Sequence, residues 1–333
     1  MRPSEPVGYS EIPARAKKVL ESFFPDEEQI AARVAQFADV QPRPSDAEGE
    51  QEVFDDVPFT HHFVDAPGDE DTVKFHYVEA GSGEPIVFLH GIPDSWYQWH
   101  HQMAELSKTH RCIGFDLKGY GQSGTDYGDY RHEAAAEQLL AALDLAGIDT
   151  FNVVAHDRGT VQADFIAAKH PDRVLRYGRG EQHLYHFHPD LAPQGPMFAD
   201  APRTGIMDDP CHFVVWLYTW ISKYPVPDEE MRRTIQEFSY PDVNRAVPRY
   251  FNSQSFRQEW LRRTRELLPA IKCPVMVMQG YESKTQPREF YEHSRDYLPN
   301  ARSVDVQYID AGHFWSMEQP EEVTSLIQKL LQL

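Results

Sequence analysis

Short apolar runs alternate with amphipathic stretches from residue 59 to the end of the chain. Residues 72–78 alternate apolar and polar side chains, as a half-exposed strand does. Four further runs are short and apolar, as expected of strands buried in a parallel sheet: 85–89, 112–115, 151–155 and 274–278. Helical stretches at 131–145, 160–169 and 320–333 lie between or after them. The pattern predicts an α/β fold with a mostly parallel central sheet covered by helices on both faces.

Two segments depart from this alternation. Residues 1–58 are rich in proline and acidic residues, with two short amphipathic helices expected at 12–24 and 30–37 and a polar linker at 41–56. This arm is expected to pack on the main body, to form a dimer contact or to cover an active site as a flap. Residues 182–265 are rich in Pro, His, Trp and Tyr, which predicts an inserted helical cap. The expected organisation is an arm (1–58), a core (59–181 and 266–333) and a cap (182–265).

Composition narrows the class of protein further. The chain carries 32 Lys and Arg against 52 Asp and Glu, a formal net charge of −20. An acidic surface is unsuited to binding nucleic acid or anionic membranes. We find no apolar stretch of about 18 residues and no signal-peptide pattern, so we expect no membrane span. The three isolated cysteines indicate reduced thiols in a cytoplasmic protein. The sequence is compatible with a homodimer.

A nucleophile turn is predicted at Val153–Thr160, where an apolar strand leads through His-Asp-Arg-Gly into a helix. Such a strand–turn–helix arrangement lifts the residue at its apex, here Asp157, above the end of the sheet. The glycine at 159 permits close packing at the sharp turn, and the following helix offers free N–H groups. The alternative is that Asp157 only caps the helix.

Three other motifs follow predicted strands. His313 lies in Ile309-Asp-Ala-Gly-His313, late in the chain, where a general base completes a triad in the order nucleophile, acid, histidine. His90–Tyr97 reads His-Gly-Ile-Pro-Asp-Ser-Trp-Tyr and can direct a backbone N–H into a site. Asp116–Ser123 is a glycine-rich turn without the Gly-Lys-Ser/Thr ending of a phosphate loop.

In this order the four motifs resemble the α/β-hydrolase fold over residues 59–333. The His-Asp-Arg-Gly turn resembles the branch with an Asp nucleophile, which contains epoxide hydrolases and haloalkane or haloacetate dehalogenases. His90–Tyr97 and Asp116–Ser123 are most similar to the epoxide hydrolase forms, which tend to read His-Gly-Phe-Pro-Glu-Ser-Trp-Tyr and Asp-Met-Lys-Gly-Tyr-Gly-x-Ser.

The resemblance implies a two-step reaction. A carboxylate is already ionised near neutral pH, so Asp157 can attack saturated carbon and form an alkyl ester. His313 would then activate a water that attacks this ester, with the backbone N–H groups of Ile92 and Arg158 binding the oxyanion. The acid that orients His313 is expected to be Glu181, with Glu282 as the alternative.

The leaving group separates the candidate reactions. Epoxide opening needs proton donors, usually two cap tyrosines or a tyrosine with a histidine. The candidates are His212 and three tyrosines: Tyr218, Tyr240 and Tyr250. His90 and Trp96 are further candidates for substrate binding. Haloalkane dehalogenases commonly carry Asn and Trp at the positions of Ile92 and Arg158.

Arg158 is the residue that favours a different substrate. It resembles a substrate-carboxylate binder of haloacetate dehalogenases, but the second arginine of that pair is replaced by Val161. Arg158 can instead pair with a carboxylate of the cap.

The sequence therefore predicts a cofactor-independent epoxide hydrolase, or a close relative, acting on a small molecule that is bulky and apolar. A halo-acid or haloalkane dehalogenase is the first alternative, and a non-covalent catalyst or ligand-binding protein on the same fold is the second. No metal is expected in this chemistry. The spacing of His183, His186 and His188 does not place them on one helical face, which disfavours a metal site there.

Overall fold

The computed structural model describes residues 14–21, 27–69, 71–126, 128–182, 194–253 and 261–333. The histidines at 183, 186 and 188, and residues 12, 13 and 22–24 of the first expected helix, lie outside these ranges. In the described ranges no helix is long and apolar enough to cross a membrane. The three cysteines form no disulfide.

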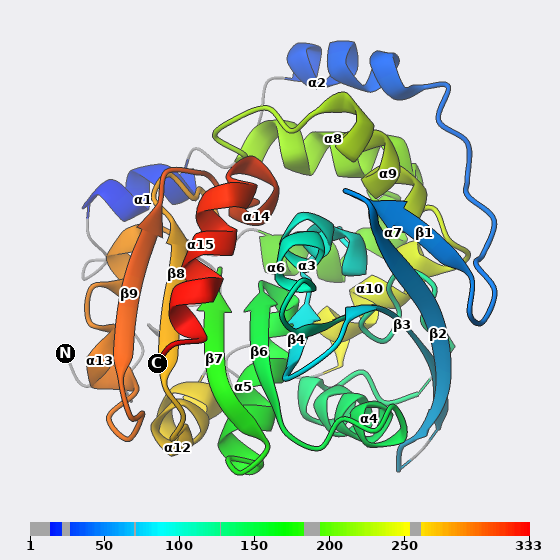
Figure 1. Ribbon diagram of the computed structural model, residues 1–333. Helices are drawn as coiled ribbons and strands as arrows, with labels where there is room; N and C mark the ends of the chain where they lie inside the picture. The colour runs from blue at the N-terminus through cyan, green and yellow to red at the C-terminus, as the bar shows by residue number, and fades with distance from the viewer. Residues whose placement is uncertain (1–13, 22–26, 70, 127, 183–193, 254–260) are drawn as a thin grey trace.

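A nine-stranded sheet in the described residues forms the centre of the molecule (Figure 1). Its strands in chain order are β1 (Gln51–Phe54), β2 (Val57–Pro67), β3 (Thr72–Gly81), β4 (Pro85–Leu89), β5 (Arg111–Phe115), β6 (Phe151–His156), β7 (Val174–Gly180), β8 (Val275–Gly280) and β9 (Val304–Ile309). Their order across the sheet is β1-β2-β3-β5-β4-β6-β7-β8-β9. The pairs from β5 to β9 are parallel, and those joining β1, β2, β3 and β5 are antiparallel. The predicted α/β-hydrolase class is confirmed.

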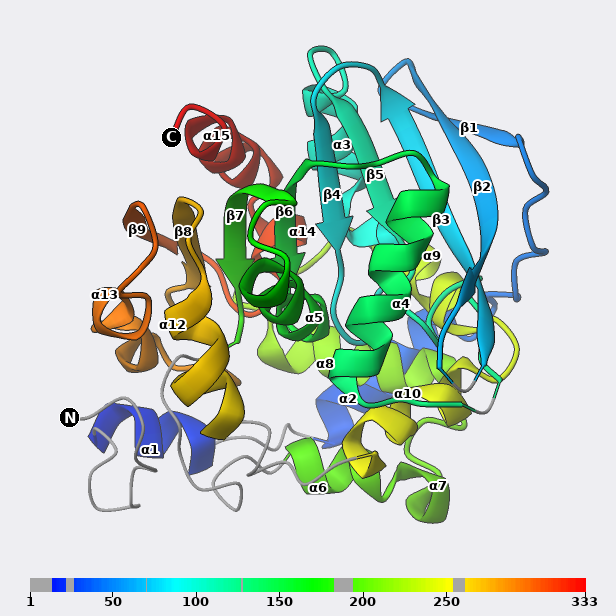
Figure 2. The ribbon, with the colours of Figure 1, turned by 90° about the horizontal axis from the view of Figure 1, so that it is seen from below.

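Helices cover both faces of this sheet, as Figure 2 shows. On one face α4 (His132–Leu145) and α5 (Arg158–Lys169) pack against each other and against the strands; on the other, α3 (His100–Leu106) packs with α15 (Pro320–Leu330). The shorter core helices are η3 (Trp96–Trp99), η5 (Arg263–Leu267), α12 (Leu268–Ala270), η6 (Arg288–Tyr291), α13 (Ser294–Tyr297) and α14 (Trp315–Glu318). The central parallel strands are buried along their whole length, which explains why they read as continuous apolar runs.

Five helices between residues 194 and 252 lie beyond the carboxyl ends of the parallel strands (Figure 1). They are α6 (Gln194–Ala199), α7 (Ala201–Thr204), α8 (Pro210–Ile221), α9 (Asp228–Phe238) and α10 (Val243–Asn252). Helix α8 is almost wholly apolar and buried because it packs on α9 and also under α2 (Glu27–Val34) of the arm. The described part of the predicted cap therefore stands over the sheet edge where Asp157 is located.

The arm is more integrated into the fold than its composition indicates. Helix α1 (Ala14–Glu21) lies within the first stretch expected to be helical, whereas α2 begins three residues before the second stretch and η2 (Ala35–Phe37) ends with it. The prediction of a linker over 41–56 is wrong at its end, because β1 pairs with β2 and extends the sheet. Strand β1 reads Gln-Glu-Val-Phe, and periodicity does not predict it because this edge strand is short and none of its residues is buried.

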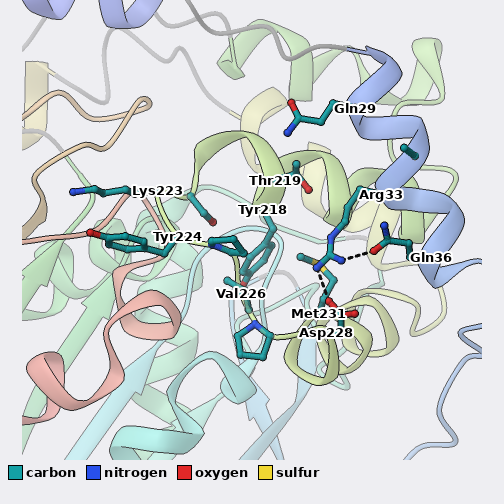
Figure 3. A pocket seen from close by; sticks show the side chains of 14 residues that line it. Gln29, Arg33, Gln36, Tyr218, Thr219, Lys223, Tyr224, Val226, Asp228 and Met231 are labelled. Atoms are coloured by element: carbon teal, nitrogen blue, oxygen red, sulfur yellow. Dashed lines mark hydrogen bonds and ion pairs between the residues drawn. The ribbon is translucent and has the colours of Figure 1, made fainter.

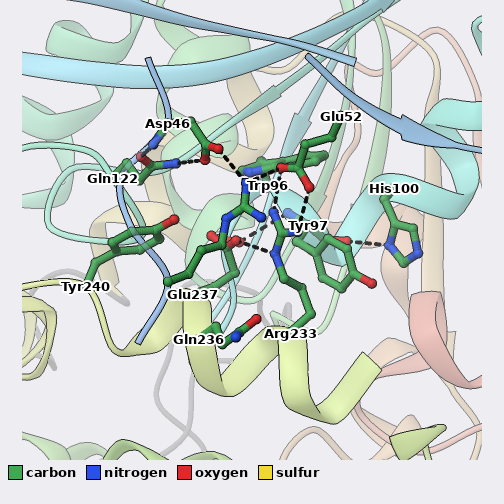
Figure 4. Close-up of polar contacts among 12 residues, drawn as sticks. Asp46, Glu52, Trp96, Tyr97, His100, Gln122, Arg233, Gln236, Glu237 and Tyr240 are labelled. Atoms are coloured by element: carbon green, nitrogen blue, oxygen red, sulfur yellow. Dashed lines mark hydrogen bonds and ion pairs between the residues drawn. The ribbon is translucent and has the colours of Figure 1, made fainter. Parts of the chain in front are cut away.

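A polar network joins this arm to the cap (Figure 4). The guanidinium of Arg233 on α9 donates from both terminal nitrogens to Glu52 of β1, at 2.7 and 2.8 Å, and from Nε to Glu237. Arg43 donates to the same Glu52 at 2.8 Å. The charged groups of the arm thus have partners on the cap, so the arm and α9 are held together.

A buried ion network lies beneath the end of β7. Asp164 on α5 accepts two hydrogen bonds from Arg179 at 2.9 Å each and a third from Arg263 at 2.6 Å, while Tyr177 donates at 2.9 Å. Asp164 and Arg179 are completely buried. The two arginines hold the pKa of Asp164 below its usual value although burial opposes this.

We expect Asp164→Asn to lower the free energy of unfolding by about 3–5 kcal/mol, because it removes the buried carboxylate that pairs with both guanidinium groups. Urea unfolding followed by fluorescence measures this change. The matched control is Asp200→Asn, which breaks an exposed pair with Arg203 and should leave the unfolding midpoint unchanged. An Asp164→Asn midpoint equal to that of the wild type would contradict this account of the network.

Candidate active site

Asp157 stands at a sharp turn between β6 and α5. Its backbone has φ 45° and ψ −115°, a conformation that costs a non-glycine residue about 1–3 kcal/mol. The turn needs glycine at two neighbouring positions: a Cβ on Gly159 would lie 2.6 Å from the carbonyl oxygens of Leu89 and His90, and one on Gly91 would lie 2.4 Å from Cβ of Asp157. The predicted nucleophile turn is therefore present in the backbone.

The two carboxylate oxygens of Asp157 have different partners. Oδ1 accepts the backbone N–H of Ile92 at 3.4 Å and has Nε of Arg158 at 3.6 Å, while Oδ2 accepts from the side chain of Gln182 at 3.3 Å. Burial raises the pKa of Asp157, but Arg158 and the neighbouring histidines together lower it by more, so the pKa lies below its usual value. Asp157 is held as a carboxylate, with one oxygen turned to a predicted oxyanion donor.

His313 and Glu181 form a buried pair. Nδ1 of His313 lies 2.8 Å from Oε2 of Glu181 and 2.7 Å from the hydroxyl of Thr285. Glu181 also accepts the N–H of Gly280 at 3.1 Å and the hydroxyl of Ser283 at 2.8 Å. Burial lowers the pKa of His313 to about 4, so the imidazole is neutral near neutral pH. Burial also raises the pKa of Glu181, whereas the donors to its carboxylate lower it. An ionised Glu181 accepts the imidazole proton from Nδ1 and leaves the lone pair of Nε2 available.

Glu282, the alternative acid, occupies a different environment. Its side chain is 45% exposed and pairs with Arg15 of the arm at 3.4 Å. The structure brings Glu181 to His313 and leaves Glu282 at the surface.

Tyr218 brings the cap to the same place. Its hydroxyl lies 2.5 Å from Oδ1 of Asp94, and its ring stacks on Phe314 with 3.8 Å between centroids. Asp94 is buried, and burial raises its pKa to about 8, with the nearby charge of Asp157 acting in the same direction. The second oxygen of Asp94 has no hydrogen-bond partner among the described residues.

A surface groove of about 760 Å³ reaches Tyr218 from the outside (Figure 3). Its walls come from α2 of the arm, including Arg33, and from the end of α8 and the start of α9, including Lys223 and Met231. The arm therefore forms one side of an opening that ends near the cap tyrosine.

Arg158 lies inside the site and does not pair with a cap carboxylate in the described residues. Its Nη1 is 3.3 Å from His132, and its guanidinium lies over the ring of Phe251 at 5.0 Å. Its Nε–H is buried and has no hydrogen-bond partner in the described part of the chain.

Five other predicted residues lie elsewhere or have other partners, and two of them are His90 and Trp96. His90 donates from Nδ1 to the carbonyl of Gly91 and accepts the N–H of Leu117 at Nε2, so backbone groups occupy both ring nitrogens. The ring of Trp96 packs against Phe54 and Phe59 on the arm side of the sheet. The structure thus corrects the expected substrate contacts of both residues.

The remaining donor candidates also differ from expectation. His212 is exposed in the first turn of α8, so the structure does not bring it to the buried Asp157. Tyr240 points to the carbonyl of Pro44 in the arm at 3.4 Å. Tyr250 donates to the carbonyl of Lys118 at 2.7 Å and accepts from Gln162 at 3.4 Å.

Sequence reasoning missed several residues that line this site. Asp94 stands within the His-Gly-Ile-Pro-Asp motif, and Gln182 directly follows Glu181, so the sequence contains a signal for both residues. The hydroxyl of Tyr120 is buried without a partner among the described residues and within electrostatic range of Asp157. Thr285 carries no sequence signal, because its position depends on the loop after β8.

Comparison with known proteins identifies the fold and the relatives. A sequence model of the alpha/beta hydrolase fold matches residues 84–177. Bifunctional epoxide hydrolase 2 of Rattus norvegicus is 24% identical, over 78% of this chain and 53% of its own length. A haloalkane dehalogenase of Agrobacterium fabrum is 27% identical, over 78% of this chain and 88% of its own.

The structure of an epoxide hydrolase, CorEH, superposes with a TM-score of 0.69 at 22% identity, covering 82% of this chain and 99% of that one. At that identity the likeness shows the fold alone. The chain spans about half the length of the mammalian relatives that it matches. It has the α/β-hydrolase fold, and the proteins that it is similar to include epoxide hydrolases and a haloalkane dehalogenase.

Proposed function

We propose that this chain is an epoxide hydrolase that needs no cofactor and acts on a small apolar epoxide through an ester on Asp157. The observation that carries the proposal is the placement of an ionised Asp157 between the Ile92 N–H and the cap, beside a buried Tyr218–Asp94 pair. A nucleophile needs no activating base here, and a departing alkoxide needs an acid.

In the first step Oδ2 of Asp157 attacks an epoxide carbon, and the C–O bond of the three-membered ring breaks. The alkoxide takes the phenolic proton of Tyr218, and Asp94, protonated near neutral pH, returns a proton to the phenolate. Burial supports this order, since it raises the pKa of Asp94 to about 8 and that of Tyr218 well above its usual value. The product of this step is a hydroxyalkyl ester of Asp157.

In the second step Nε2 of His313 takes a proton from water, and the hydroxide attacks the ester carbonyl. The oxyanion develops on Oδ1, where Ile92 and Arg158 offer backbone N–H groups worth about 3–4 kcal/mol each in comparable sites. The ester bond breaks, and the diol oxygen takes the proton from His313. The remaining proton of the attacking water leaves the Asp157 carboxyl and restores Asp94, so Asp157 returns to a carboxylate. Glu181 keeps the imidazole in the required tautomer.

Arg158 supports a second candidate, a dehalogenase acting on a halo-acid. Its buried Nε–H has no hydrogen-bond partner among the described residues and lies 3.6 Å from Oδ1 of Asp157. At this place it can bind a substrate carboxylate. The same ester chemistry would then release halide. Ion chromatography for halide, against diol analysis by chromatography, separates the two reactions.

We expect His313→Gln to accumulate the ester, because attack on carbon needs no base whereas ester hydrolysis does. Mass spectrometry of the intact protein after incubation with a turned-over epoxide should show a mass increase equal to that of the substrate, on the peptide that contains Asp157. The double variant with Asp157→Asn is the control and should stay unmodified. If His313→Gln gains no mass with any substrate of the wild type, the chain acts without covalent attack, as the non-covalent hypothesis requires.

The choice of orienting acid is tested by a matched pair of variants. Glu181→Gln should slow ester hydrolysis by about 10²–10⁴-fold, since the neutral amide no longer favours the productive imidazole tautomer. Glu282→Gln, at an exposed position, should leave this rate within about twofold of wild type. Single-turnover measurements of ester decay give both values. The reverse pattern would transfer the role to Glu282.

Protonation of Asp94 predicts an alkaline limit for the first step. Its pKa of about 8 lies above the usual value, so the acid form is present below that pH and is lost as pH rises through it. We expect the rate of ester formation to fall above about pH 8 because an Asp94 carboxylate retains the Tyr218 proton. Asp94→Asn should remove this limb. Tyr218→Phe should slow ester formation by about 10²–10⁴-fold at all pH values.

Stopped-flow measurement of ester formation in the His313→Gln background isolates this step. Tyr281→Phe, at an exposed tyrosine, is the control and should not change the rate. A limb that persists unchanged in Asp94→Asn would show that another group controls the leaving oxygen.

A further inference from the structure

A second cluster of chemically active side chains lies between α3 and α9, apart from the proposed chemistry. Nε2 of His100 and Nε2 of His101, on the first turn of α3, both approach Oε1 of Glu230 on α9, at 3.4 and 3.1 Å. All three ligand atoms lie within 4.8 Å of one another. Two imidazole nitrogens and one carboxylate oxygen thus converge on one point between the core and the cap.

The spacing of these atoms suits a small divalent ion. Zinc binds His nitrogen and carboxylate oxygen at about 2.0–2.1 Å in tetrahedral geometry, which separates adjacent ligand atoms by about 3.3 Å. The observed separations of 3.1 and 3.4 Å fall on either side of this value. A set of two histidines and one glutamate with a fourth position open is an established zinc arrangement in proteins.

Outer hydrogen bonds prepare both buried ligands for this role. His100 lies 2.8 Å from the carbonyl of Tyr97 through Nδ1 (Figure 4), and a carbonyl can only accept, so Nδ1 carries the proton. In the neutral ring with this tautomer, the lone pair of Nε2 faces Glu230. The hydroxyl of Tyr97 donates to the other oxygen of Glu230 at 2.7 Å, which fixes the carboxylate. Such support of both ligand types is typical of metal sites.

Charge points the same way. Two imidazoles with 3.9 Å between ring centroids face one carboxylate. Because Nδ1 of His100 already donates to the carbonyl of Tyr97, a second proton on its Nε2 would make this ring positive against the ring of His101. One divalent ion instead satisfies all three groups with neutral imidazoles. The side chains of His100 and Glu230 are nearly buried, and that of His101 is 32% exposed, which leaves an entry path from solvent.

The other cluster of this kind among the described residues does not need an ion. Asp46, Glu52 and His61 also bring three ligand atoms together, but Arg43 and Arg233 donate to their carboxylates. The positive charge there is already supplied by the protein. No arginine or lysine is paired with Glu230 in the described part of the chain.

We propose that His100, His101 and Glu230 bind one divalent transition-metal ion, with Zn²⁺ as the preferred ion, and that this ion joins the core helix α3 to the cap helix α9. The site lies outside the Asp157 chemistry, which still needs no metal. Its existence does not depend on the proposed hydrolase activity.

Isothermal titration of the EDTA-treated full chain with ZnCl₂ tests the site. We expect one saturable ion per chain, and Co²⁺ in its place should give the visible absorption of a tetrahedral complex. His101→Asn and Glu230→Gln should each weaken binding by at least about tenfold, and Tyr97→Phe by about 10–100-fold through the loss of the outer hydrogen bond. His293→Asn, which removes an exposed histidine, is the control and should not change the affinity.

Thermal unfolding gives a second readout. Zn²⁺ should raise the unfolding temperature of the wild type and of His293→Asn, but not that of His101→Asn. His101 is partly exposed, so this variant keeps the fold while it loses the ligand. An absence of saturable binding, or an affinity that is equal in the wild type and in His101→Asn, overturns the proposal. Loss of binding in His61→Asn with binding retained in His101→Asn would also overturn it.

Discussion

The backbone conformation of Asp157 is the constraint on which the site depends. A positive φ at a buried, non-glycine residue is unfavourable in isolation, and here the surrounding structure holds it. The N–H of Asp157 donates to the carbonyl of Gly180 at 3.1 Å, and the N–H of Gly159 donates to the carbonyl of His90 at 2.8 Å. The turn is therefore fastened to the ends of both neighbouring strands. This places the carboxylate beside the Ile92 N–H and under the cap without any contribution from a ligand.

The end of β7 is fixed by a different interaction. Arg179 donates to both oxygens of Asp164 and also to the carbonyl of Gln182. This guanidinium thus spans the turn that contains Glu181, whose φ is also positive, at 51°. Gln182 in turn donates to Oδ2 of Asp157, and Glu181 contacts His313. The buried Arg179–Asp164 ion pair therefore helps to position Gln182 beside Asp157 and Glu181 beside His313. The same interaction thus contributes both to the stability of the fold and to the geometry of the site.

The fold and the motif residues were predictable because they depend on local pattern. The buried strand at 85–89 and the Asp157 turn are encoded by contiguous residues, so the expected and observed bounds agree. The roles of the cap residues could not be predicted in this way, because they depend on how the helix lies against other elements. Tyr218 and His212 are on the same helix, yet Tyr218 is buried and His212 is exposed. His90 failed as a substrate contact because backbone groups of two loops use its nitrogens. Periodicity also missed β1, because this short edge strand is held by its backbone pairing with β2 and buries none of its side chains.

Two aspartates near the cap show how one site can hold opposite protonation states. Asp157 and Asp94 are both buried, which alone would raise the pKa of each. The guanidinium of Arg158 and the N–H of Ile92 lower the pKa of Asp157 and hold it ionised. Among the described residues Asp94 accepts a hydrogen bond from Tyr218, and the negative charge of Asp157 raises its pKa further. The ionisation of the first carboxyl therefore helps to keep the second one protonated. The proposed nucleophile and the proposed proton donor are thus the same residue type with different pKa values because their neighbours differ. Acid–base chemistry near neutral pH requires a separation of this kind.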